Sequence, residues 1–215
     1  MDGPKLDQRT DEQLLDAYRR GESPVLEVLV RRHHDDLLRF LYRLTGSRTT
    51  AEDVFQEAFL QVHLSAGTFD ASRRFKPWLF TIAANKARDF LRKNARRRTL
   101  DLDAPVGRGR SGGDGGEATF VDLMALDGLT PPEVFDETQR DAKVQQAISS
   151  MPLLMREILL LAYFQRMSYS QIADALNIPL GTVKSRLHSA VAAFAKAWNQ
   201  VNPPEATSTN GSAEP

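Results

Sequence analysis

Apolar residues recur every three or four positions along most of the chain, a spacing typical of amphipathic α-helices. In the first half the pattern predicts helices over residues 11–20, 24–45, 50–64 and 77–98, and further helices follow between residues 131 and 198. No segment alternates with the period of two that a half-buried strand needs. The predicted fold class is therefore all-α, with two small helical domains joined by a flexible linker.

Local signals define where the predicted helices begin and end. Thr10 and Gln13 are spaced as a capping box, and Ser23-Pro24 has the pattern of an N-cap followed by proline at the first helical position. Gly46 is expected to end the second helix, and Thr50 to begin the third. Met151-Pro152 is expected to separate two helices of the second half.

Composition divides the chain into four parts. Residues 1–100 form the predicted N-terminal domain, and residues 101–130 are Gly-rich and acidic without hydrophobic periodicity, as in a linker. Residues 131–200 form the predicted C-terminal domain, and residues 201–215 have the composition of a disordered tail. A short apolar patch at residues 120–129 has no assigned role.

Formal net charge is zero, but the charges are segregated. Residues 86–98 carry seven basic residues and one acid, whereas residues 99–140 carry nine acids and three arginines. A partner meets such local patches rather than the total. The chain has no cysteine, which excludes disulfides and thiolate chemistry. No secretory signal or run of ~20 apolar residues is evident, so we expect a soluble, cytoplasmic protein without membrane insertion.

Residues 75–98 have two faces of different chemistry. An apolar stripe includes Leu79 and Ala83, while the opposite face carries Trp78, Asn85 and Arg88. An aromatic ring beside guanidinium groups suits stacking on unpaired bases and holding phosphates. A basic, solvated helix end is the alternative interpretation.

The helix over residues 50–64 also has an unusual outer face. Asp53 and Glu57 share it with Leu60 and Leu64. Leucines on an acidic face predict a docking patch for a basic, partly apolar partner. The alternative is that another helix of the same domain covers them.

Residues 168–198 have the spacing of a helix-turn-helix. Ala173 is small where two helices cross, Asn177 tolerates the left-handed backbone of the turn, and Val183 starts the core stripe of the second helix. That helix would enter the major groove by its N-terminal half. No acid lies between Leu180 and Trp198, which favours DNA binding over a purely structural hairpin.

Three segments together, AEDVFQEAFLQV, FKPWLFTIAANKARDFLRK and MSYSQIADALNIPLGTVKSRL, resemble the bacterial RNA polymerase sigma factors of the extracytoplasmic-function (ECF) group. The resemblance implies transcription initiation, with core RNA polymerase (through its clamp coiled coil and flap) and promoter DNA as partners. An anti-sigma factor stays an open possibility. No cofactor, metal or catalytic residue is implied.

The resemblance also implies a division of labour among the candidate residues. Polymerase binding falls to Asp53, Gln56, Glu57 and Leu60. Reading and melting of the minus-ten element fall to Trp78, Thr81, Asn85, Lys86, Arg88, Asp89, Arg92 and Lys93. Reading of the minus-thirty-five element falls to Thr182, Lys184, Ser185, Arg186 and His188.

Two other functions explain less of the sequence. His33-His34-Asp35-Asp36 invites a metal-enzyme interpretation, but consecutive helical residues point about 100° apart and cannot converge on one ion. A stand-alone helix-turn-helix regulator would explain residues 168–198. Such a regulator would not explain the helix face that carries Trp78, Asn85 and Arg88. It would also not explain the face that carries Asp53, Glu57 and Leu60.

Overall fold

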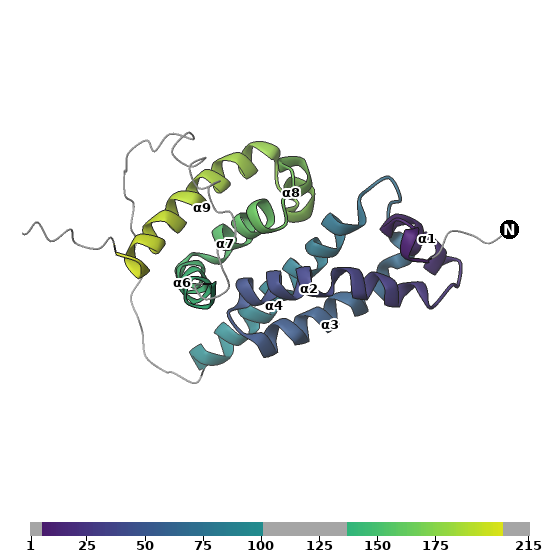
Figure 1. The fold of residues 1–215 in the computed structure, drawn as a ribbon, viewed down its shortest axis with the longest axis horizontal. Coiled ribbons are helices and arrows are strands. Elements are labelled where there is room, and N and C mark those ends of the chain that lie inside the picture. The colour runs from purple at the N-terminus through teal and green to yellow at the C-terminus, as the bar shows by residue number, and fades with distance from the viewer. Residues whose placement is uncertain (1–5, 101–136, 204–215) are drawn as a thin grey trace, which may run out of the picture.

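The computed structural model describes residues 6–100 and 137–203. Within these ranges the chain is helical and has no strand, which confirms the all-α class. The first half contains η1 (Leu6–Gln8), α1 (Asp11–Arg19), α2 (Val25–Thr45), α3 (Arg48–Ser65), η2 (Ala66–Thr68) and α4 (Phe75–Leu100). The second half contains α6 (Glu137–Ser150), α7 (Leu153–Leu159), the π-helical segment η4 (Leu160–Phe164), α8 (Tyr169–Leu176) and α9 (Leu180–Val201) (Figure 1).

Some predicted helix ends are confirmed. The Thr10 side chain accepts from the Gln13 N–H while the Gln13 side chain accepts from the Thr10 N–H, which completes the capping box of α1. Gly46 ends α2 in the left-handed conformation at φ 74°, which costs glycine little. Pro152 separates α6 from α7.

Two predicted helix starts are wrong. Ser23 does not cap α2, whose N-cap is Pro24 with no side-chain cap bond. The third helix begins earlier than Thr50, because the Ser47 hydroxyl accepts from the Thr50 N–H at 3.3 Å and α3 starts at Arg48. Several residues in this stretch could cap a helix. Ser47 does so because it directly follows the chain reversal at Gly46.

The first half packs around α2, which contacts α1, α3 and α4. Fully buried large side chains include Leu14, Leu29, Phe40, Leu79 and Phe80. The rings of Phe40 and Phe80 meet edge to face at 5.2 Å between centroids. Burial of each such side chain contributes about 1.5–3 kcal/mol, so these contacts fix α4 against α2.

In the second half α9 contacts α6, α7 and α8. The π-helical segment η4 leads into Arg166, which has φ 51°. The N–H of Met167 donates to the Leu161 carbonyl at 3.1 Å. This irregular turn directs the chain from the buried α7 into the exposed start of α8.

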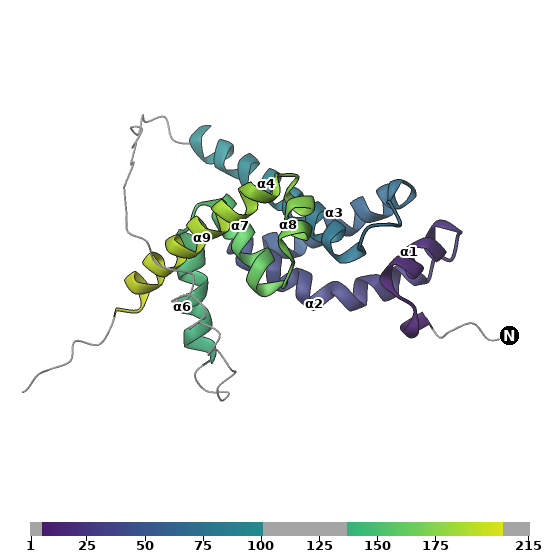
Figure 2. The same cartoon turned by 90° about the horizontal axis from the view of Figure 1, so that it is seen from above.

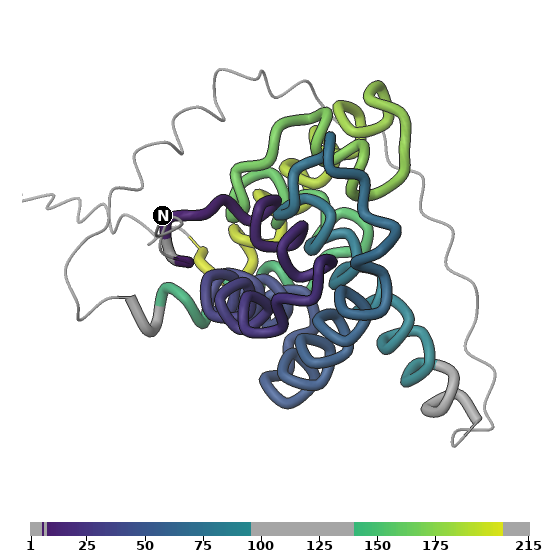
Figure 3. The backbone as a smooth tube through the Cα atoms, turned by 90° about the vertical axis from the view of Figure 1, so that its right-hand side faces the viewer, coloured from purple at the N-terminus to yellow at the C-terminus, as the bar shows by residue number. Residues whose placement is uncertain are grey.

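The two halves pack against each other, a contact that the sequence did not predict. One continuous cluster of buried residues spans both. Helix α2 contacts α6, α7 and η4, and α4 contacts α8. Figure 2 shows α8 over α4 from above, and Figure 3 shows the green and yellow second half stacked on the blue and teal first half.

Polar contacts also join the halves. The Arg43 guanidinium pairs with Asp141 at 3.0 Å, and Arg156 Nη1 donates to the Leu44 carbonyl at 2.7 Å. The predicted linker at residues 101–130, its apolar patch at 120–129 and the helix start near Pro131 lie outside the described residues. So does the tail beyond residue 203. The three predicted boundaries between the four parts of the chain stay predictions.

Candidate nucleic-acid interface

Trp78 is held rigidly near the start of α4. Its ring lies 4.8 Å from Phe69 and 5.9 Å from the buried Phe75, measured between centroids. The Thr81 hydroxyl donates to the Pro77 carbonyl at 2.8 Å. Both side chains are half-buried. The aromatic cluster therefore fixes the orientation of one indole face, which a stacking platform requires.

The basic part of α4 follows one turn later. Asn85 is exposed, and its side-chain oxygen accepts from the Arg88 guanidinium. Lys86 is half-buried, and the exposed side chains are Asp89, Arg92 and Lys93. The structure thus brings the predicted minus-ten residues onto one helix. Some of them are half-buried or already contact other side chains.

Arg88 is directed toward a buried acid of the second half. Its Nε lies 3.4 Å from Oε1 of Glu157, which is 1% exposed. The geometry allows an ion pair but no hydrogen bond, and neither carboxylate oxygen of Glu157 has a hydrogen-bond partner. Burial raises the pKa of Glu157 to about 7, against the opposing attraction of Arg88, Arg186 and Arg92. Three predicted DNA-contacting arginines therefore influence one buried carboxyl group, and Arg88 lies beside it.

Glu157 is not among the residues that the sequence pattern predicted to be functional. The signal was present, because Leu153, Glu157, Leu160 and Leu161 follow the i, i+4, i+7, i+8 spacing of one helix face. A lone acid on an otherwise apolar face predicts a buried charge with a partner elsewhere. Which partner it meets depends on the contact between the halves.

The helix-turn-helix is formed as predicted. Asn177 ends α8 in the left-handed conformation at φ 51°. Val183, Leu187 and Ala190 bury one face of α9. A capping box between Ser168 and Gln171, missed in the sequence, begins α8.

The predicted minus-thirty-five residues differ in how far they are exposed. Lys184, Ser185 and His188 are exposed, and Thr182 is half-buried. Arg186 is half-buried and lies near enough to Glu157 to influence its pKa. The outer face of α9 can therefore meet DNA as it stands, whereas Arg186 is half-buried.

The predicted docking face of α3 is uncovered. Asp53, Gln56 and Glu57 are exposed, and Leu60 and Leu64 are 58% and 68% exposed. The alternative that another helix of the domain covers these leucines is wrong for the described part of the chain. An exposed acidic face with two leucines is a suitable surface for a partner.

The two neighbouring histidines have separate partners. His33 is buried and its Nε2 lies 2.7 Å from Asp11 of α1, while the exposed His34 contacts Asp35. Partial burial raises the pKa of Asp11, but hydrogen bonds to His33 and Arg32 outweigh it and hold that pKa below its usual value. Among residues 6–100 and 137–203, no group of three His, Cys, Asp or Glu side chains could hold a metal ion.

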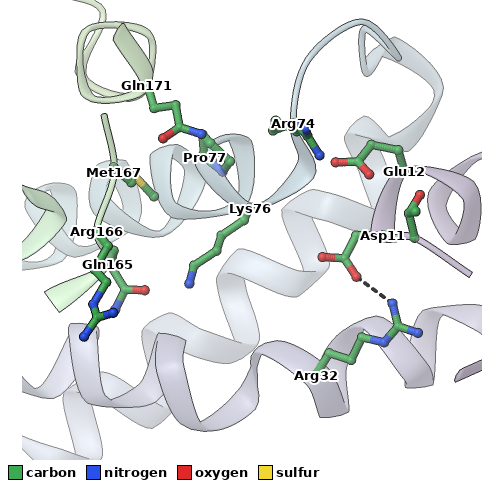
Figure 4. Close-up of a pocket in the computed structure, with 11 residues that line it drawn as sticks. Asp11, Glu12, Arg32, Arg74, Lys76, Pro77, Gln165, Arg166, Met167 and Gln171 are labelled. Carbon is green, nitrogen blue, oxygen red and sulfur yellow. Dashed lines mark hydrogen bonds and ion pairs between the residues drawn. The ribbon is translucent and has the colours of Figure 1, made fainter. Parts of the chain in front are cut away.

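A groove of about 530 Å³ lies between the start of α4 and the turn before α8 (Figure 4). Lys76 points into it from α4, and Gln165 and Arg166 line it from the second half. The Lys76 ammonium lies 3.4 Å from Asp36, and Arg32 pairs with Asp11 at 2.9 Å. Much of the positive charge here is thus neutralised by neighbouring acids, and the groove marks a polar gap between the halves.

The arrangement of helices defines a helix-turn-helix protein with a second, separate basic helix. Residues 29–97 match Sigma-70 region 2, and residues 141–194 match Sigma-70 region 4. The chain belongs to the ECF RNA polymerase sigma factors. A stand-alone helix-turn-helix regulator does not account for the region 2 match.

Relatives match over most of the chain. It is 32% identical over 170 residues to ECF RNA polymerase sigma factor SigW of Bacillus subtilis, covering 79% of this chain and 87% of that protein. It is 31% identical over 192 residues to the RNA polymerase sigma-H factor of Pseudomonas aeruginosa, covering 89% and 95% respectively.

Solved structures show the same fold. CnrH, solved in complex with the cytosolic domain of CnrY, aligns with a TM-score of 0.61 at 21% identity, covering 88% of this chain and 97% of that one. The sigma factor RpoE from Bartonella quintana, solved with the anti-sigma factor NepR, aligns with a TM-score of 0.57 at 20% identity. The alignment covers 80% of this chain and 94% of that one. No helix in the described ranges is long and apolar enough to cross a membrane.

Proposed function

We propose that this sigma factor binds core RNA polymerase through the outer face of α3, reads and melts the minus-ten element with α4, and reads the minus-thirty-five element with α9. The observation that carries the proposal is the uncovered α3 face, where Asp53, Gln56, Glu57 and Leu60 are all exposed. A protein that acted on DNA alone would have no use for that face.

The proposed action of α4 is physical rather than covalent. Opening DNA costs a few kcal/mol per unstacked base, and stacking on an aromatic ring returns about 1–3 kcal/mol per base. Trp78 is already oriented by Phe69 and Phe75, so little ordering is needed when a base stacks on it. Arg92 and Lys93 lie exposed further along α4 and would hold phosphates of the opened strand.

The exposed residues of α9 are suited to duplex DNA. Ser185 and His188 can reach base edges, while Lys184 can contact phosphate or guanine. In this proposal the chain contributes no catalytic residue, because the polymerase carries out the phosphodiester chemistry. Its place of action would be the cytoplasm, where polymerase and promoters are found.

An anti-sigma factor is part of the proposal. The CnrH and RpoE structures were both solved with partner proteins, and NepR is named as an anti-sigma factor. The fold that this chain shares with them is compatible with such a partner.

The decisive experiment reverses the charge of the α3 face. Asp53→Lys with Glu57→Lys should weaken association with core polymerase by more than about ten-fold, because both exposed acids would repel a basic partner. Co-purification and run-off transcription measure the effect. Glu27→Lys with Asp35→Lys, on the exposed side of α2, makes the same change of charge elsewhere. Unchanged association of the α3 variant would contradict the proposed docking face.

A further inference from the structure

Two of the predicted minus-ten residues of α4 are bonded to each other. Nη2 of Arg88 donates to Oδ1 of Asn85, three positions earlier on the same helix. Side chains three positions apart are neighbours on a helix surface, so α4 makes this contact by itself. A hydrogen bond from a charged donor is roughly twice as strong as one between neutral groups. The bond therefore holds the Asn85 amide in one orientation.

The Arg88 guanidinium is fixed from its other edge as well. Its side chain is 21% exposed, and its buried Nε lies 3.4 Å from Oε1 of Glu157. A guanidinium is planar and rigid, so holding the Nε edge limits where Nη2 can point. Asn85 is exposed. Arg88 thus supports, from the protein side, an amide that can meet DNA.

The orientation of the amide decides which base it can read. An amide has an acceptor oxygen and an NH₂ group that donates. Because Arg88 occupies the oxygen, Asn85 is left to donate through Nδ2. Guanine and thymine present carbonyl acceptors, whereas adenine and cytosine present amino groups, and the two-bond contact of asparagine with adenine needs the amide oxygen free. A donating amide favours guanine and thymine.

We propose that Arg88 is a positioning residue that makes Asn85 a hydrogen-bond donor, so that guanine or thymine is preferred over adenine at the minus-ten base that Asn85 reads. The inference rests on the proposed function, because it assigns unpaired bases to α4. Arg88 serves Asn85 rather than a phosphate. Arg92 and Lys93, exposed further along α4, are left for the phosphates.

Thr81, one turn before Asn85, has no such support. Its hydroxyl donates to the Pro77 carbonyl at 2.8 Å, a bond between neutral groups. A hydroxyl hydrogen can rotate to suit a new partner, so Thr81 can still donate or accept when DNA arrives. Of these two polar side chains, Asn85 is the one whose polarity the protein sets in advance.

Base preference of the holoenzyme tests the proposal. The template is a promoter that wild-type holoenzyme transcribes, with the minus-ten positions randomised one at a time, and sequencing of a transcribed barcode gives the yield for each base. Asn85→Ala identifies the position that Asn85 reads, because base preference should be lost there. At that position the wild type should prefer guanine or thymine over adenine by at least about five-fold. A wild-type preference for adenine there, or no position altered by Asn85→Ala, would overturn the proposal.

Two replacements of Arg88 separate its donor from its charge. Arg88→Met removes both, frees the Asn85 oxygen and should raise the yield with adenine to that of guanine and thymine. Arg88→Gln removes the charge alone, since glutamine three positions from asparagine can still donate to its oxygen, and should keep the wild-type preference. If Arg88 merely held a phosphate, both variants would lose yield equally with all bases. That result would reject the positioning role.

Arg92→Ala is the matched control. Arg92 is exposed about one turn later on α4, and its replacement removes the same charge. The yield should fall for all templates alike, with the order of the bases unchanged. A shift toward adenine as large as that of Arg88→Met would mean that charge rather than the bond to Asn85 sets the preference, against the proposal.

Loss of Arg88 also leaves Glu157 buried without the cation beside it. Thermal melting therefore accompanies the transcription assay. If Arg88→Met is unfolded at the assay temperature, all variants are compared in a Glu157→Gln background, in which no buried acid needs a partner. The expected base preferences are the same in that background.

The two proposals fail in different ways. If wild-type holoenzyme transcribed no promoter of its host, the proposed function would fail. If it transcribed normally, and folded Arg88→Met kept the wild-type order of bases, only the positioning role of Arg88 would be rejected.

Discussion

The two DNA-reading surfaces of this protein differ in how much of each is accessible. On α9, Lys184, Ser185 and His188 are exposed. On α4, Trp78 and Thr81 face α8 across a narrow cavity, and Arg88 lies against Glu157. The surface that reads duplex DNA is largely open, whereas the surface that must hold unpaired bases is partly covered, at Trp78, Thr81 and Arg88.

This difference follows from the chemistry of the two tasks. An aromatic face and arginines that bind single strands would also bind other nucleic acid without sequence preference, since stacking and phosphate contacts are sequence-tolerant. Covering that face inside the protein limits such binding. The readers of base edges on α9 need no such cover, because their contacts are specific.

The largest effect is expected from removing the stacking platform. Trp78→Ala with Asn85→Ala should reduce promoter opening about 100-fold, because the loss of ~1–3 kcal/mol of stacking per base adds to the loss of the amide. Permanganate reactivity of unpaired thymines measures opening, and co-purification measures polymerase binding. Polymerase binding should change little, since the α3 face is untouched.

Trp78 also packs on Phe69 and Phe75, so the stability of that variant has to be measured alongside. Asn85→Ala alone alters an exposed side chain and should keep the fold intact. Equal losses of opening and of polymerase binding in a folded variant would contradict the separate roles given to α4 and α3.

An effect of similar size, but on stability, is expected from the buried carboxyl group beside Arg88. Burial raises the pKa of Glu157 from 4.5 to about 7, against the attraction of Arg88 beside it and of Arg186 and Arg92. Between these values the folded protein keeps a proton that the unfolded chain has released. Stability should therefore fall as pH rises from about 4.5 to 7, by up to ~3 kcal/mol in all, and stay level above that range.

Urea denaturation of wild type and Glu157→Gln, at several pH values from 5 to 8, measures this term. The glutamine amide cannot ionise, so the unfolding free energy of the variant should rise relative to that of the wild type as pH rises. Starting at pH 5 keeps Asp11 and Asp36 ionised, since both have lowered pKa values and contribute the opposite pH dependence in more acid solution. If the unfolding free energies of the two proteins changed with pH in the same way, the pKa of Glu157 would not be raised by burial.

The smallest effect is expected on the open surface. Lys184→Ala should weaken binding at promoters that depend on the minus-thirty-five element by about 3- to 10-fold and reduce the salt dependence by one phosphate contact. Arg186→Ala should add a loss of thermal stability, because it also leaves Glu157 less neutralised. Lys196→Ala, exposed further along α9, is the control. Identical behaviour of the Lys184 and Arg186 variants would show that Arg186 does not stabilise the charged form of Glu157.

The sequence predicted helix ends best where one residue type was decisive. Asn177 and Gly46 both occupy left-handed backbone, which few other residues tolerate. It predicted them worst where several residues could do the same work. Ser47 and Thr50 can both accept a backbone N–H, and the position of Gly46 decided in favour of Ser47.

The candidate site shows the same division. Periodicity placed Trp78, Asn85 and Arg88 on one face of a helix, and placed Asp53, Glu57 and Leu60 on one face of another. It could not tell that the α3 face would be exposed while α8 would lie against the α4 face. Exposure depends on what packs against a helix, which its own sequence does not contain.

The sequence alone determined the all-α class, the helix-turn-helix and the chemistry of three functional faces, because helix periodicity and capping act between residues close in the chain. Only the tertiary structure decided that the two halves share one buried cluster, that Arg88 meets Glu157 and that Arg43 meets Asp141. These contacts join residues about 70 to 100 positions apart in the sequence. They form only when burial of apolar surface brings the halves together, and no local pattern encodes that.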